Sequence, residues 1–265
     1  QPGSSFKPFV YMSALENGLQ PNSLILDAPF VLDQGKDLGK WKPENYGKKF
    51  YGPSTLRKGI ENSRNLMTIR IAQYLGMDKI SEIANRVDIM NDMPKVLSMA
   101  LGAGETTLIE LTSAYASFVN GGKKISPIMI DRIQDRRGKN IFLADFGTCS
   151  NCSDPFIAEN PIPIFKNNNE QIFDPINSYQ MVSILKGAVD RGTGRKTKIT
   201  GFEIGGKTGT TNKNTDAWFI GFTSDLIIGV YAGFDKPRTL GKRETGSSIA
   251  VPIFKDFLTD YYHEK

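Results

Sequence analysis

Hydroxyl and amine side chains recur in this 265-residue sequence at spacings that suit nucleophilic catalysis, but the sequence contains a single histidine. A Ser-His-Asp arrangement needs an imidazole as its base. The one available, His263, lies at a chain end that we expect to fray. The sequence therefore disfavours this arrangement, and a serine nucleophile would need another base, for which lysine is the obvious choice.

A serine and a lysine three positions apart occur twice, at Ser4–Lys7 and at Ser183–Lys186. On a helix, residues i and i+3 share one face, so the hydroxyl and the amine of each pair can meet. The motif is weak alone, because about one copy is expected by chance in a chain of this size. The alternatives are a helix N-cap for Ser4 or Ser5 and a surface pair for the second copy.

Two further patterns stand later in the chain. The only S-x-N triplet, Ser63 to Asn65, lies where two predicted helices meet, so its polar side chains would be presented rather than buried. A K-T-G triplet, Lys207 to Gly209, lies on a predicted strand whose glycines allow a ligand or another backbone to approach closely. Taken singly, the S-x-N triplet is equally well explained as a helix stop followed by an N-cap. The K-T-G triplet alone is equally well explained as part of a glycine-rich edge strand with a turn.

In combination, the order S-x-x-K, S-x-N, K-T-G resembles the signature of the penicillin-binding protein and serine β-lactamase superfamily. The longer stretches are similar to the transpeptidase domain of bifunctional, class A penicillin-binding proteins. That similarity is carried by QPGSSFKPFVY, WKPENYGKKFYGPSTLRKGIENSRNLMTIRIA, TTLIELTSAYASFVNGG and GGKTGTTNKNTDAWFIGFT. It runs from residue 1 to about residue 260, which is nearly the whole chain.

The resemblance implies catalytic roles for five residues. Ser4 would be the acylated nucleophile and Lys7 its general base, which requires a neutral amine and a pKa below the free-lysine value of about 10.4. Burial and a neighbouring cation both lower the pKa of a lysine, and Lys207 could supply that cation. Ser63 would relay a proton to the leaving group. Asn65 would orient Lys7 and bind the substrate backbone.

The strand that carries K-T-G is implied to bind substrate. Lys207, Thr208 and Thr210 would hold the terminal carboxylate of the donor peptide, with Gly209 and Thr211 beside them. The backbone N–H groups of Ser4 and Thr210 would form the oxyanion hole.

These roles imply a peptidoglycan DD-transpeptidase that uses no cofactor and no metal. Ser4 would cleave the D-Ala-D-Ala end of one stem peptide, an amine of a neighbouring stem peptide would resolve the acyl-enzyme, and β-lactams would acylate the same serine. The family also implies a periplasmic location, an upstream glycosyltransferase domain and a membrane anchor. In the family, segments before the S-x-x-K motif also contribute strands to the central sheet. We therefore expect that this sequence lacks an N-terminal portion and that its sheet lacks those strands.

Three alternatives remain. A class A β-lactamase needs a deacylating glutamate, which the family carries in an E-x-x-L-N stretch after S-x-N; this sequence has none, which favours a transpeptidase. A penicillin-sensing domain is the second. A basic module for cell-wall polymer or nucleic acid is suggested only by the net charge of +5. Lysines and arginines are spread along the chain, however, which favours a solvated surface, and we expect no nucleic-acid partner.

Helices are expected to fill the first half of the chain. Helical spacing of apolar residues and stop glycines predict helices at 4–17, 54–62 with Ser54 as its cap, 65–75, 79–87 and 106–122. They form a helical block over residues 1–122.

The second half, residues 123–265, is expected to be rich in strands. We expect a hairpin at 124–142 around DRRG, a polar excursion over 142–176, a helix at 177–189, strands at 202–210, 216–223 and 226–234, and a helix at 247–262. Short links between the three strands predict an antiparallel meander. The sequence thus predicts one α+β domain over residues 1–265, in which helices flank an antiparallel sheet.

Cys149 and Cys152 are the only cysteines, so the chain lacks the four ligands that a structural zinc site needs. Their flanks are typical of a loop rather than of a helix start. We therefore expect a loop-closing disulfide in an oxidising compartment, and no metal site.

Overall fold

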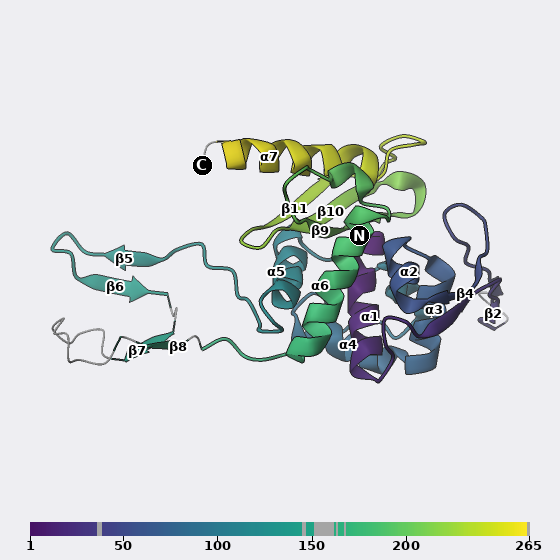
Figure 1. Cartoon of the computed structure of the whole chain (residues 1–265), viewed down its shortest axis with the longest axis horizontal. Coiled ribbons are helices and arrows are strands. Elements are labelled where there is room, and N and C mark those ends of the chain that lie inside the picture. Colours follow the sequence, from purple (N-terminus) through teal and green to yellow (C-terminus); the bar gives the residue numbers. More distant parts are fainter. Residues whose placement is uncertain (36–38, 145–146, 151–161, 163, 167, 264–265) are drawn as a thin grey trace.

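The computed structural model describes residues 1–35, 39–144, 147–150, 162, 164–166 and 168–263, and its α+β fold confirms the prediction. The α-helices are α1 Lys7–Glu16, α2 Leu56–Glu61, α3 Asn65–Leu75, α4 Met77–Arg86, α5 Leu108–Val119, α6 Pro175–Asp190 and α7 Val251–His263. A three-stranded sheet lies between α7 on one face and α1, α5 and α6 on the other (Figure 1). Helices α2 and α3 lie beside α1, and α4 lies near the end of α1 that is farther from the sheet.

The sheet runs in the order β11–β10–β9, with β9 at Gly205–Thr210, β10 at Asp216–Phe222 and β11 at Ile227–Gly233. The predicted antiparallel meander is confirmed. The central strand β10 reads DAWFIGF, and its residues after Asp216 are all buried, because helices cover both faces of the sheet. Strand β9 begins at Gly205 rather than at residue 202, because the Phe202 N–H closes a turn onto the Ile199 carbonyl at 3.2 Å.

Helix α1 crosses the centre of the molecule (Figure 1), and every residue from Lys7 to Leu15 is buried. A 3₁₀ turn, η1 Gly3–Phe6, precedes it, so the helix predicted over 4–17 is confirmed with a tighter first turn. Pro8 lies in the first turn, where its missing N–H removes no intrahelical hydrogen bond. The buried, mostly apolar helix α1 therefore positions Lys7, its first residue, and Ser4 in the turn that precedes it.

Side-chain caps decide where the helices beside the sheet begin. Helix α5 opens with a capping box, in which Thr107 Oγ1 accepts from Glu110 N at 3.2 Å and Glu110 Oε2 accepts from Thr107 N at 2.8 Å. Helix α6 opens on Asp174, whose carboxylate accepts from Ile176 N at 2.8 Å.

Helix α2 corrects one expectation. Its N-cap is Thr55, whose hydroxyl accepts from Lys58 N at 3.3 Å, and not Ser54. Ser54 belongs to a strand and pairs with Ile25, and this pairing delays the helix by one residue. The predicted helical block thus also contains short strands: β1 Leu24–Asp27, β2 Leu32–Asp33, β3 Lys40–Trp41 and β4 Gly52–Thr55.

An arm projects from the body between α5 and α6 (Figure 1). The predicted hairpin is confirmed as β5 Arg132–Gln134 and β6 Asn140–Leu143, and Ile133 lies opposite Phe142 with both side chains exposed. Beside it, β7 Thr148–Ser150 pairs with β8 Ile164–Lys166. Cys149 lies in β7 and Cys152 lies outside the described residues, so their disulfide stays a prediction.

The terminal helix is confirmed from Val251 onward, after a π-helical turn over Gly246–Ala250. Phe254 of α7 packs edge-on against Phe219 of β10, with ring centroids 4.9 Å apart. In the part of the chain that the structure describes, none of the helices has the length and apolar character needed to cross a bilayer. The assignment of residues 1–265 to one domain stays a prediction.

Candidate active site

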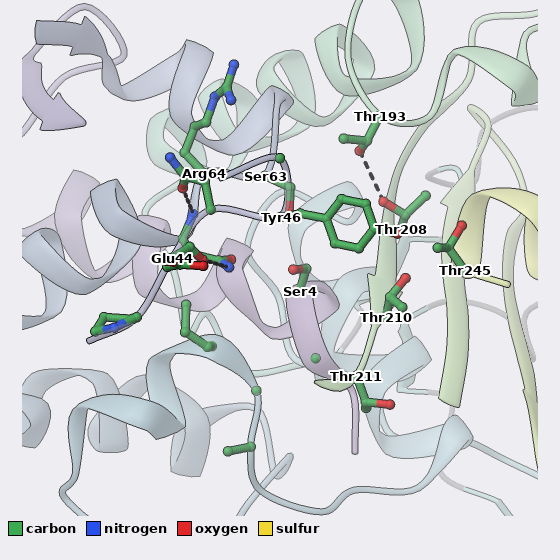
Figure 2. Close-up of a pocket in the computed structure, with 18 of the residues that line it drawn as sticks. Ser4, Glu44, Tyr46, Ser63, Arg64, Thr193, Thr208, Thr210, Thr211 and Thr245 are labelled. Atoms are coloured by element: carbon green, nitrogen blue, oxygen red, sulfur yellow. Dashed lines mark hydrogen bonds between the residues drawn. The ribbon is translucent and has the colours of Figure 1, made fainter. Parts of the chain in front are cut away.

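A cavity of about 580 Å³ opens where η1, the S-x-N turn and the edge strand β9 meet (Figure 2). Most of the residues predicted for the site line its wall, and two lysines lie directly beneath it, both fully buried. The predicted residues on the wall are Ser4, Ser63, Asn65, Thr208, Thr210 and Thr211. The tertiary structure thus brings together three motifs that are far apart in the sequence.

Lys7 lies one helical turn beyond Ser4, and its side-chain nitrogen is surrounded by oxygen atoms. Nζ donates to Asn65 Oδ1 at 2.6 Å and to the Ser63 carbonyl at 2.7 Å, and it lies 3.2 Å from Ser63 Oγ. The first two oxygens can only accept, whereas the hydroxyl can also donate. A neutral Lys7 amine therefore satisfies both short bonds and keeps its lone pair for a hydroxyl proton.

Burial favours that neutral form. With its side chain fully buried and the cations of Lys207 and Arg64 nearby, the pKa of Lys7 lies well below its usual value of 10.5. Burial also lowers the pKa of Lys207, to about 7.

Ser63 joins the two lysines. Its backbone has a φ of +56°, in the left-handed region, which turns its side chain out of the break between α2 and α3. Ser63 Oγ then accepts from Lys207 Nζ at 3.0 Å, and Lys207 Nζ also donates to the Thr208 carbonyl at 3.1 Å. The third N–H of Lys207 is left over for a ligand in this arrangement.

Ser4 and Ser5 behave differently although they are neighbours. Ser5 is fully buried within η1, and its hydroxyl donates to the Pro2 carbonyl at 2.6 Å, so neither it nor Ser4 is the N-cap that the alternative interpretation expects. Ser4 is half-buried on the cavity wall, and its hydroxyl makes no hydrogen bond among the described residues. Figure 2 shows the Ser4 side chain directed into the open space between Ser63 and Thr210.

The second S-x-x-K copy is a surface pair, as the alternative interpretation expects. Ser183 Oγ accepts from Arg57, and Lys186 forms an exposed ion pair with Glu203 at 2.6 Å. Neither Ser183 nor Lys186 lines the cavity.

Two glycines let η1 lie directly on β9. A Cβ on Gly3, whose φ is +53°, would lie 2.5 Å from the Thr210 carbonyl oxygen. A Cβ on Gly209 would lie 2.4 Å from the Pro2 carbonyl oxygen. Any side chain at either position would push the Ser4 turn away from the strand, since real Cβ atoms do not approach so closely.

A loop within the stretch WKPENYGKKF, to whose residues no role was assigned from the sequence, forms the opposite wall. Asn45 is buried, and its Oδ1 accepts from Asn65 N at 2.9 Å, so it caps the start of α3. Asn65 Nδ2 donates to the Glu44 carbonyl at 2.7 Å, which links this loop to Lys7 through one side chain. The next residue, Tyr46, is 78% exposed and extends its ring over the cavity (Figure 2).

Comparison with known proteins identifies the family. A family model described as the penicillin-binding protein transpeptidase domain matches residues 1–259. This chain belongs to that family. Penicillin-binding protein 1A of Rickettsia bellii is 46% identical over 267 residues, which cover 100% of this chain and 34% of that protein. The chain therefore spans about a third of the length of the curated relatives it matches.

Solved structures of the family share the fold of this transpeptidase domain. The crystal structure of penicillin-binding protein 1A from Haemophilus influenzae aligns with a TM-score of 0.82 at 33% identity, over 98% of this chain and 42% of that chain. PonA1 from Mycobacterium tuberculosis, solved in complex with penicillin V, aligns at 0.77 and 21% identity, over 96% of this chain and 67% of that chain.

The sequence did not predict several hydroxyl residues on the wall of this transpeptidase domain, among them Thr193, Thr245 and Ser247. Thr193 Oγ1 lies 3.0 Å from Thr208 Oγ1, and Thr245 and Ser247 line the cavity at the start of the π-helical turn. Thr193 and Thr245 lie outside helices and strands, and Ser247 lies in the π-helical turn over Gly246–Ala250. The only signal in the sequence is a glycine beside each residue, as in RGTG and TGSS.

Proposed function

We propose that this transpeptidase domain is a peptidoglycan DD-transpeptidase that forms an acyl-enzyme on Ser4. The observation that carries the proposal is the cluster beneath Ser4, in which two buried lysines share the hydroxyl of Ser63. A cluster of this kind supplies a base, a proton relay and a cation within one cavity.

The donor stem peptide would bind along β9. Its terminal carboxylate would take the free N–H of Lys207 and the hydroxyls of Thr208 and Thr210, with Gly209 and Thr211 completing the strand edge. Thr208 and Thr210 both line the cavity beside Ser4. The backbone N–H groups of Ser4 and Thr210 would stabilise the oxyanion.

Acylation would follow from this arrangement. Ser4 Oγ attacks the carbonyl carbon of the penultimate D-alanine while its proton passes to the neutral amine of Lys7. As the intermediate collapses, the Ser63 hydroxyl gives its proton to the departing D-alanine nitrogen. Ser63 is then reprotonated by the Lys7 ammonium group, which Asn65 Oδ1 holds in position by a hydrogen bond. An acceptor amine then attacks the ester carbonyl, and Ser4 recovers a proton as the cross-link forms.

A β-lactamase would need a carboxylate positioned to activate water against the acyl-enzyme. Among the described residues that line the cavity, the only acid is Glu44, and it joins the network through its backbone carbonyl rather than its carboxylate. This supports slow deacylation and therefore cross-linking.

The remaining assignments follow from the same proposal. We expect D-Ala-D-Ala stem peptides, acceptor amines and β-lactams as ligands, and a location on the extracytoplasmic side of the inner membrane where peptidoglycan is assembled. The glycosyltransferase activity and the membrane anchor stay predictions about the longer protein.

A fluorescent penicillin tests the proposal directly. We expect stoichiometric labelling of the wild-type chain, loss of labelling in Ser4→Ala, and normal labelling in Ser183→Ala, which removes the serine of the second S-x-x-K copy. Retained labelling in Ser4→Ala would show that another residue is acylated. Release of the label within minutes rather than hours would assign the chain to the β-lactamases instead.

A further inference from the structure

A buried carboxylate lies just behind the active site and has no place in the mechanism above. Glu61 is the last residue of α2, two positions before Ser63, and its side chain is 4% exposed. Arg191, the residue after α6, binds the Glu61 carboxylate through two hydrogen bonds. Its Nε donates to Oε2 at 2.9 Å, and its NH2 donates to Oε1 at 2.5 Å. Neither residue lines the active-site cavity.

The backbone around Arg191 also closes on Glu61. Thr193 N donates to the Glu61 carbonyl at 3.1 Å, and a Cβ on Gly192 would lie 2.2 Å from that same oxygen. A Cβ on Gly187 would lie 2.1 Å from Glu61 Oε1. Residues 187–193 therefore pack against both the side chain and the backbone of Glu61. Glycine at positions 187 and 192 makes this close contact possible.

This contact continues into the active site on both sides. On one side, the chain from Glu61 leads in two residues to Ser63, which binds both lysines. On the other side, the chain from Arg191 leads in two residues to Thr193, whose hydroxyl lies 3.0 Å from that of Thr208. Glu61 and Arg191 thus join the turn that carries Ser63 to the strand that carries the K-T-G motif.

We propose that Glu61 and Arg191 are positioning residues that set the distance between Ser63 and Thr208, and hence between the proton relay and the carboxylate-binding hydroxyls. The inference rests on the proposed function. Neither residue would touch substrate; both would act through Ser63 and Thr193. A displacement of about 1 Å in such groups can lower a rate on the order of a hundredfold.

Stability alone does not explain a charged pair at this place. Glu61 is buried but the Arg191 side chain is 56% exposed, so solvent screens much of their attraction, and Arg57 lies only 3.8 Å from Glu61 Oε1 as a second cation. Removing Arg191 alone weakens the pairing of a buried carboxylate, whereas replacing both Glu61 and Arg191 with apolar residues avoids that cost. A double replacement can therefore remove the pair while preserving the fold, which separates the positioning role from a purely structural one.

The test measures acylation of the full chain by a penicillin and by its carboxylate methyl ester, with a thermal melt for each variant. We expect Glu61→Gln and the double variant Glu61→Met/Arg191→Met to be acylated at least about tenfold more slowly by the free acid. Acylation by the ester should fall less, because the ester does not use the Thr208 side of the site. The ratio of the two rates reports positioning, and a general loss of stability would not move it.

A matched control exists elsewhere in the fold. Arg86 of α4 holds Glu16 of α1 with two similar bonds, at 3.1 and 2.5 Å, and neither residue lines the cavity. Glu16→Gln should lower the melting temperature and leave both acylation rates unchanged. Wild-type rates in the double variant, or an equal fall for free acid and ester, would overturn the inference. A wild-type chain that is not acylated at Ser4 would instead overturn the proposed function itself.

Discussion

The proposed reaction requires Lys7 to be neutral and Lys207 to be positively charged. Lys7 must be neutral to accept a proton, and burial together with Lys207 and Arg64 keeps its pKa well below 10.5. Lys207 must be charged to attract a carboxylate, and burial places its pKa at about 7. We therefore expect the acylation rate to rise with pH as Lys7 deprotonates and to fall above about pH 7 as Lys207 deprotonates.

This profile is measured as the second-order rate constant of acylation from about pH 5 to about pH 10. A penicillin methyl ester should lose the alkaline limb, because it has no carboxylate for Lys207 to attract. An alkaline limb that persists with the ester would contradict the role given to Lys207.

The three motifs in order led to a family resemblance, and that resemblance, rather than any one motif, named the site residues. Ser4 and Ser63 reach the cavity wall, and Lys7 and Lys207 lie beneath it, as the resemblance implies. The loop that carries Asn45 and Tyr46 lies in a stretch that carries the resemblance, but its position at the site could not be predicted in this way. Its place depends on hydrogen bonds to α3, which no local pattern encodes.

At the level of elements, the close contact between η1 and β9 fixes where Ser4 stands. In Gly3→Ala, the new Cβ would meet the Thr210 carbonyl oxygen at 2.5 Å and separate the two elements. We expect acylation to fall on the order of a hundredfold, because Ser4 would move relative to Thr210. The variant should still melt cooperatively, since η1 is one short turn.

Gly18 provides the control. It has a φ of +87°, so alanine is strained there as it is at Gly3, but a Cβ would meet nothing within 4 Å. Gly18→Ala should cost about 1 kcal/mol of stability and leave acylation unchanged. Equal losses of acylation in both variants would show that the effect is one of stability and not of contact.

Elements with strong local signals were predicted well, and errors arose where two elements compete for one residue. Helix α5, with its capping box, and the meander of β9 to β11 are examples of the first kind. Ser54 is an example of the second, because its pairing with Ile25 is a long-range contact that outweighs its helix-capping preference.

At the level of the whole molecule, the projecting arm is separate from the catalytic body. Strands β5 and β6 pair with each other, and their apolar side chains, including Ile141 and Leu143, are exposed. Replacing residues 128–143 with a short glycine-serine linker should therefore leave the melting temperature and the acylation rate unchanged. Both are measured on the purified chain, and a slower acylation would show that the arm supports the site.

The cavity wall draws on residues from the first turn of the chain to Ser247, and each section is rooted in a different helix or strand. A chain in which any of these elements is unfolded cannot assemble it. Covalent uptake of a penicillin would therefore count only molecules in which all the elements of the wall have folded. A pulse of label during refolding would report the last step of assembly, even where circular dichroism already registers most of the helices.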